Sequence, residues 1–129
     1  MLAIDTNVVV RYLTDDHPEQ APRARAIIDG ASVFVPVTVI LESEWVLRSA
    51  YDYDRTDVVH ALRAFGGLPT VSIEDADKVA AALDLATLGM DFADALHLGR
   101  SGHCDGFVTF DRRLAKTAAD AGHTAVRDA

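Results

Sequence analysis

The chain has 129 residues, half of them hydrophobic, and a formal net charge of −8. This length suits one ordinary domain with a real core, and no apolar run approaches the roughly 18 residues of a membrane span. The acidic balance argues against non-specific nucleic-acid binding through a broad basic surface. The N-terminus lacks the pattern of a secretory signal, so we expect a cytoplasmic protein.

Short apolar runs rich in β-branched residues alternate with longer segments of helical period. This alternation is typical of βαβ units and predicts an α/β fold with a parallel sheet. The predicted strands are Leu2–Ile4, Val33–Val35, Val71 with its neighbours, Phe107–Thr109 and Thr124–Val126.

Helices are predicted in the intervals between these strands. The segment Val37–Ala50 has an apolar face that includes Trp45, and Asp54 is the expected cap of a helix through Phe65. Ser72 and Asp75 resemble a capping box that would open the next helix. A short helix follows Gly89, and the last one ends at Gly122.

Four carboxylates stand where the chain changes direction: Asp5, Glu42, Asp94 and Asp111. In a parallel sheet, strand ends of one sense meet at one edge, where ligands bind. Acids collected there would hold a hard divalent cation such as Mg²⁺ or Mn²⁺ and favour phosphate chemistry.

Each acid also has an ordinary structural interpretation. Asp5 and Asp111 could be helix N-caps, and we favour the same role for Asp91 over a place beside the metal ligands. Asp94 is harder to explain in this way, because it lies in an apolar helix with no basic residue within a turn.

Neighbouring residues add polar and basic groups to this set. Thr6, Asn7 and Thr109 could orient a carboxylate or a bound water. Arg112, Arg113 and Lys116 could reach the phosphates of a nucleic acid, or could equally form a solvated helix face.

Taken together, these segments resemble the successive motifs of PIN-domain ribonucleases, and most of all VapC-type toxins of toxin–antitoxin pairs. The resemblance rests on four segments in order along the chain: Asp5–Asn7, Glu42 with Trp45–Arg48, Asp91–Leu96 and Thr109–Arg112. It implies a single domain over residues 1–129, an α/β/α sandwich with a central parallel sheet.

The resemblance also implies Mg²⁺- or Mn²⁺-dependent endonucleolytic cleavage of RNA by Asp5, Glu42, Asp94 and Asp111, with Thr6, Asn7, Asp91 and Thr109 in support. It further implies a homodimer and a VapB-like antitoxin that occupies the site. For the dimer, we expect the apolar surfaces of Val58–Phe65 and Tyr51–Tyr53 to contribute.

Two other functions fit parts of the pattern. A phospho-acceptor domain of receiver type shares the size and the Asp at a strand end, but it needs a lysine near the last strands. The only lysines, Lys78 and Lys116, are both expected within helices. A non-catalytic binding protein with a structural metal is the third possibility.

Overall fold

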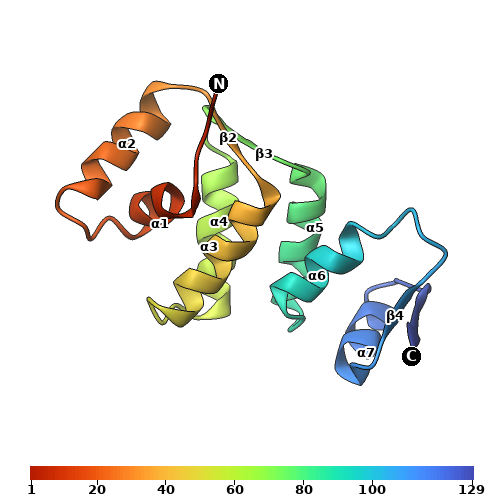
Figure 1. Cartoon of the computed structure of the whole chain (residues 1–129). Coiled ribbons are helices and arrows are strands. Elements are labelled where there is room, and N and C mark those ends of the chain that lie inside the picture. The colour runs from red at the N-terminus through yellow and green to blue at the C-terminus, as the bar shows by residue number, and fades with distance from the viewer. The chain divides into compact units, whose positions relative to one another are not determined.

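The computed structural model describes residues 1–129 and divides them into two compact units, Met1–Ala76 and Asp77–Ala129. Figure 1 shows the elements in chain order. The first unit contains β1 (Leu2–Ala3), α1 (Thr6–Thr14), α2 (Gln20–Gly30), β2 (Val33–Val35), α3 (Val37–Ser49), α4 (Arg55–Gly66) and β3 (Val71–Ile73). From the unit boundary onwards follow α5 (Ala76–Thr87), α6 (Phe92–Gly99), β4 (Phe107–Thr109), α7 (Arg112–Asp120) and β5 (Val126–Asp128).

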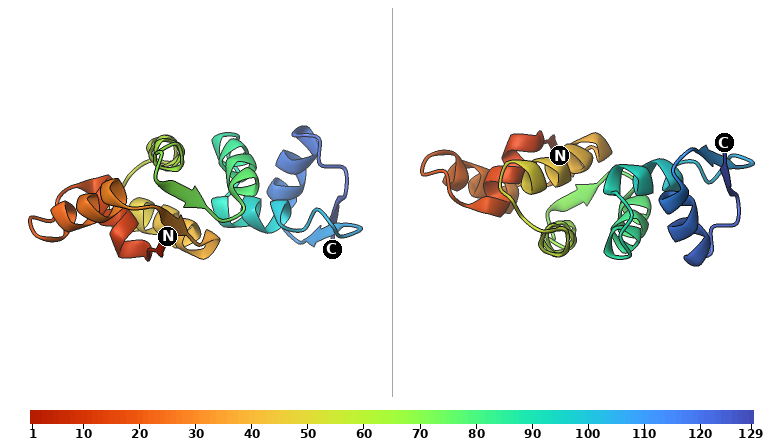
Figure 2. Two further views of the ribbon diagram at one scale, coloured as in Figure 1. Left: turned by 90° about the horizontal axis from the view of Figure 1, so that it is seen from above. Right: turned by 90° about the horizontal axis from the view of Figure 1, so that it is seen from below.

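The first unit is built on a three-stranded parallel sheet with the order β1-β2-β3. The central strand β2 has Val33 and Val35 fully buried, as expected for a strand paired on both sides. In all the views of Figures 1 and 2, α1 and α2 lie side by side, and α1 also packs on α3. Helix α4 contacts β3 and completes the core with Phe65. The ring of Phe65 meets that of Tyr12 edge-on, with the two ring centroids 5.8 Å apart.

The second unit contains a two-stranded parallel sheet of β4 and β5, against which α7 packs. Leu114 and Ala118, one turn apart on α7, are buried. Gly122 follows this helix with a φ of 94°, the left-handed conformation that glycine adopts without steric cost. None of the seven helices has the length and apolar character needed to cross a bilayer.

Most predicted elements are confirmed, but β1 ends at Ala3, one residue earlier than predicted, and two others differ more. Ser72 lies inside β3 and pairs with Phe34, so the predicted capping box does not exist, and α5 begins only at Ala76. The last strand covers Val126–Asp128 instead of Thr124–Val126, and it pairs with β4 from Val126, which lies opposite Phe107.

The predicted apolar face of α3 is wrong at Trp45, which is 59% exposed. The buried face runs through Val37, Ile40, Glu44 and Leu47 instead, so a glutamate occupies the place expected for an aromatic residue. Its burial is tolerated because Arg48, one turn later, donates two hydrogen bonds of 2.5 and 3.0 Å to its carboxylate.

Candidate metal and phosphate site

The chain leaves β1 through buried Ile4 and turns at Asp5 into α1. Asp5 is the N-cap of this helix, and its carboxylate accepts a hydrogen bond from Val8 N at 3.4 Å. The expected alternative of a helix cap is therefore confirmed for Asp5. The cap fixes the carboxylate at the end of the strand, and one oxygen remains for other partners.

Glu42 lies on the exposed side of α3, one position before the buried residues Ser43 and Glu44. The hydroxyl of Thr6, itself buried, donates a hydrogen bond to Glu42 Oε1. This contact joins residues 36 positions apart and holds the glutamate beside the start of α1. The supporting role of Thr6 at a metal site stays a prediction, and this hydrogen bond is the contact that such a role requires.

Asp5, Thr6, Asn7, Glu42 and Val46 line one cavity of about 240 Å³. Its polar wall offers two carboxylates, a hydroxyl and a side-chain amide, and all of these present oxygen atoms. Such a donor set suits Mg²⁺ or Mn²⁺, which prefer oxygen ligands. The chemistry of this cavity therefore fits the cation expected from the sequence.

In the second unit, Asp91 is the N-cap of α6 and accepts a hydrogen bond from Asp94 N at 3.3 Å. This confirms the role that we favoured for Asp91. Asp94 follows in the first turn of the helix and is half-buried.

The carboxyl group of Asp94 has a raised pKa. Burial is the main cause, the negative charge of Asp91 raises the pKa further, His97 lowers it, and Asp111 raises it. The negative charges of Asp91 and Asp111 disfavour ionisation of Asp94, and a cation bound beside these carboxylates would offset that repulsion.

Asp111 is the N-cap of α7 and accepts hydrogen bonds from Arg113 N at 2.9 Å and Leu114 N at 3.1 Å. The hydroxyl of Thr109 accepts one from Asp111 N at 3.0 Å, as its position two residues earlier suggested. Asp111 therefore also has the capping role that we considered, while its side chain stays exposed.

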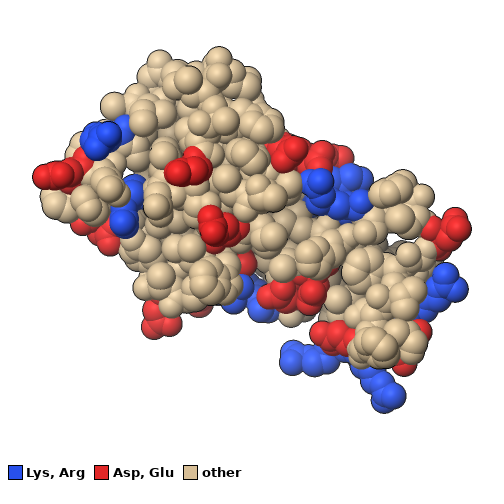
Figure 3. Space-filling model, in the orientation of Figure 1, with Lys and Arg blue, Asp and Glu red and all other residues tan.

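The basic residues of α7 differ from one another. Arg112 and Arg113 are exposed at its start, whereas Lys116 pairs with Asp120 at 3.0 Å. Figure 3 shows acidic and basic side chains interspersed over the visible face.

The structure thus brings Asp5 together with Glu42 in the first unit, and Asp94 near Asp91 and Asp111 in the second. No group of three or more His, Cys, Asp or Glu side chains is arranged to hold a metal ion. A single centre made of all four acids therefore stays a prediction.

The sequence analysis missed three features: the pairing of buried Glu44 with Arg48, exposed Trp45, and a second cavity that includes Arg11 and Arg23. The spacing of four between Glu44 and Arg48 was the available signal for the first.

Comparison with protein families gives a match to the PIN domain over residues 2–120, which includes all four acids. The search of curated proteins found no match. The PIN domain is a nuclease fold, and its members are typically hydrolases that use divalent metal ions. Parallel strands with seven helices agree with the α/β/α architecture of that fold. The chain therefore belongs to the PIN domain family.

Proposed function

We propose that this protein is an endoribonuclease that cleaves RNA phosphodiester bonds with Mg²⁺ or Mn²⁺ and acts as a VapC-type toxin. The observation that carries the proposal is the oxygen-lined cavity of Asp5, Thr6 and Glu42, in a chain whose PIN match spans all four predicted acids. Family membership also favours a nuclease over the receiver-type alternative.

In this proposal residues 1–129 form a single domain, and Asp5, Glu42, Asp94 and Asp111 hold the metal. When bound, the cation supplies Lewis acidity, which lowers the pKa of water and neutralises charge on phosphate oxygens. Thr6 fixes the Glu42 carboxylate through its hydrogen bond, and the capping contacts of Asp5 and Asp111 orient these two side chains.

Water is the proposed nucleophile. Its oxygen forms the new bond to phosphorus, the bond to the 3′ oxygen breaks, and the proton lost by water balances the one gained by the leaving group. The products are a 5′-phosphate and a 3′-hydroxyl. Arg112 and Arg113, exposed at the start of α7, are the proposed contacts to RNA phosphates, with Lys116 as a weaker one because it already pairs with Asp120.

The test is incubation of purified protein with structured RNA in Mg²⁺, in Mn²⁺ and in EDTA. Cleavage is expected only with metal, and an Asp5→Asn variant purified in parallel controls for contaminating ribonucleases. Undiminished cleavage in EDTA, or products with a 2′,3′-cyclic phosphate, would contradict the proposal, because a cyclic product requires attack by the ribose.

The toxin role requires a partner. We propose a VapB-like antitoxin, encoded beside this gene, that places a basic side chain near the acids at Asp5 and Asp94 and so competes with the metal. Co-expression should restore growth to cells that make this protein. If the neighbouring gene product neither binds nor rescues growth, the toxin proposal is wrong, while the nuclease proposal stands on the cleavage assay.

A homodimer is the remaining part of the proposal. The argument from the segment Val58–Phe65 is wrong, because Val58, Val59, Leu62 and Phe65 are buried in the first unit. Tyr51 and Tyr53 are half-buried and contact each other, with ring centroids 6.3 Å apart. Exposed Trp45 on α3 gives better support, since a large exposed aromatic side chain is typical of interfaces. Sedimentation that shows only monomer at micromolar concentration would contradict it.

A further inference from the structure

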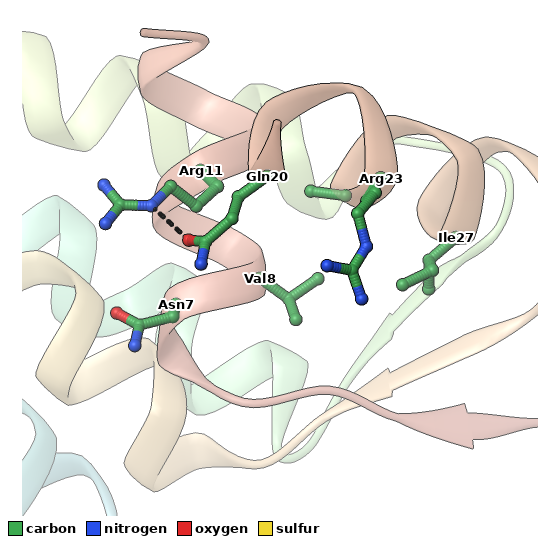
Figure 4. A pocket seen from close by; sticks show the side chains of 7 residues that line it. Asn7, Val8, Arg11, Gln20, Arg23 and Ile27 are labelled. Atoms are coloured by element: carbon green, nitrogen blue, oxygen red, sulfur yellow. Dashed lines mark hydrogen bonds between the residues drawn. The ribbon is translucent and has the colours of Figure 1, made fainter. Parts of the chain in front are cut away.

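A second cavity, of about 190 Å³, lies between α1 and α2 in the first unit (Figure 4). Three apolar side chains, Val8, Ala24 and Ile27, form one part of its wall. The polar part consists of Asn7, Arg11, Gln20 and Arg23, and no residue of the lining is acidic. Asn7 also lines the cavity of Asp5 and Glu42, so the two cavities adjoin at this residue.

Arg11 is held in place within this cavity. Its Nε donates to Gln20 Oε1 at 2.8 Å, and its Nη1 donates to the hydroxyl of Tyr51 at 2.6 Å. A guanidinium has five N–H donors, so the others remain available to a ligand. Because these contacts already order the side chain, binding of an anion costs less conformational entropy.

Arg23 is exposed and makes no hydrogen bond or ion pair within the protein. Figure 4 shows its guanidinium between Val8 and Ile27, over the space between the two helices. By contrast, Arg25, two residues later on α2, pairs with Asp15. The cavity thus concentrates two positive charges without a carboxylate, in a protein whose net charge is −8.

We propose that this cavity is an RNA subsite that binds the backbone next to the bond cleaved, with neighbouring phosphates on Arg11 and Arg23 and a ribose against Val8 and Ile27. The proposal rests on the proposed RNA cleavage. The shared residue Asn7 supports it, because it places this cavity next to the one of Asp5 and Glu42, where the scissile phosphate is proposed to bind. The cavity also offers two guanidinium groups, and guanidinium groups suit phosphate recognition.

The test measures binding of a fluorescently labelled single-stranded RNA of about ten nucleotides, a length within the usual range for such sites. The protein carries Asp94→Asn to prevent cleavage, and the buffer contains Mg²⁺. Adding Arg23→Gln should weaken RNA binding about tenfold, because one charge-assisted phosphate contact is lost. It should also reduce the slope of log Kd against log salt by about 0.7, the value for one phosphate contact to a single strand.

Arg25→Gln is the matched control, since it removes the same charge from the same helix outside the cavity. We expect its Kd for RNA and its salt slope to stay within twofold of the values for the protein that carries Asp94→Asn alone. Equal effects of Arg23→Gln and Arg25→Gln would overturn the subsite, because they would indicate only a general effect of net charge. Circular dichroism should show both variants folded.

A glutamate-rich peptide provides the second arm. If the peptide binds and depends on Arg23 while RNA binding does not, the cavity is a protein-docking surface and the subsite proposal is overturned. The function is tested separately: absence of cleavage by the unmodified protein contradicts the nuclease, whereas cleavage and RNA binding that do not respond to Arg23→Gln contradict only the subsite.

Discussion

At the residue scale, Asp94 is the acid whose surroundings most disfavour its charge. Its raised pKa means that the folded protein holds this proton more tightly than the unfolded chain does. The free energy of unfolding therefore falls as the pH rises from the ordinary value of 3.8 through the raised pKa, and remains lower above it. At neutral pH, without metal, ionised Asp94 is a destabilising residue.

We accordingly expect Asp94→Asn to abolish cleavage and to melt higher than the unmodified protein when both are metal-free at neutral pH. Each kcal/mol of relieved cost corresponds to about 4 °C for a domain of this size. The difference should shrink as the pH is lowered through the raised pKa of Asp94 and should disappear below the ordinary value of 3.8. Asp105→Asn, an exposed acid of the same unit, is the control for net charge. If Asp94→Asn melts lower, Asp94 is a structural acid and its assignment to the metal is wrong.

Asp5 and Asp111 show how one side chain can serve the fold and the proposed chemistry together. Both cap helices through one carboxylate oxygen, Oδ1, so the second oxygen is left for a cation. The choice between cap and ligand that the sequence posed is therefore not exclusive. A helix start after a parallel strand places a carboxylate at the sheet edge in either role.

At the element scale, α3 carries two glutamates with opposite environments. Glu42 is exposed, lines the acid cavity and accepts from Thr6. Glu44 is 3% exposed and paired with Arg48. Successive residues of a helix point about 100° apart, so two residues two positions apart point to nearly opposite sides. Glu42 therefore faces the cavity while Glu44 faces the core.

Glu42→Gln should reduce cleavage by at least about a hundredfold while changing the free energy of unfolding by less than about 0.5 kcal/mol. Glu44→Gln should do the reverse. It should lower the free energy of unfolding by about 2 kcal/mol, since Arg48 loses one charged partner but is itself partly exposed. The cleavage rate of the folded variant should stay near that of the unmodified protein. Urea denaturation and initial cleavage rates provide the two measurements. Loss of activity in a well-folded Glu44→Gln would show that the roles have been misassigned.

The sequence predicts the elements of this protein better than the faces of its helices. Val33–Val35 and Phe107–Thr109 are recovered as strands because short β-branched runs between turn signals have few other interpretations. The buried face of α3 is predicted wrongly because Trp45 is hydrophobic and Glu44 is charged. The helical period allows either residue on the buried face, and the pairing of Glu44 with Arg48 is what makes burial of Glu44 possible. The Arg11–Arg23 cavity could not be predicted, since it depends on how α1 packs on α2.

At the scale of the whole molecule, the predicted four-acid centre draws on both units. Asp5 and Glu42 belong to Met1–Ala76, and Asp94 and Asp111 to Asp77–Ala129. If all four acids hold the same cation, that cation should stabilise both units together, because it binds only the folded protein. The free energy of unfolding should rise by about 2.7 kcal/mol when the cation concentration is 100 times its Kd.

Amide hydrogen exchange with and without Mg²⁺ tests this prediction. The reporters are peptides that cover the starts of α1, α6 and α7, where Val8, Asp94 and Leu114 donate backbone N–H groups to the capping acids. We expect Mg²⁺ to slow exchange in all three, because the cation would fix Asp5, Asp94 and Asp111, which lie at the starts of these helices, and so suppress local opening. In Asp5→Asn the Mg²⁺-dependent slowing should fall in the second unit as well as in the first, since both units would have lost a shared ligand. Slowing confined to α1 would mean that Asp5 and Glu42 bind the cation alone, and the assignment of Asp94 and Asp111 as ligands would be wrong.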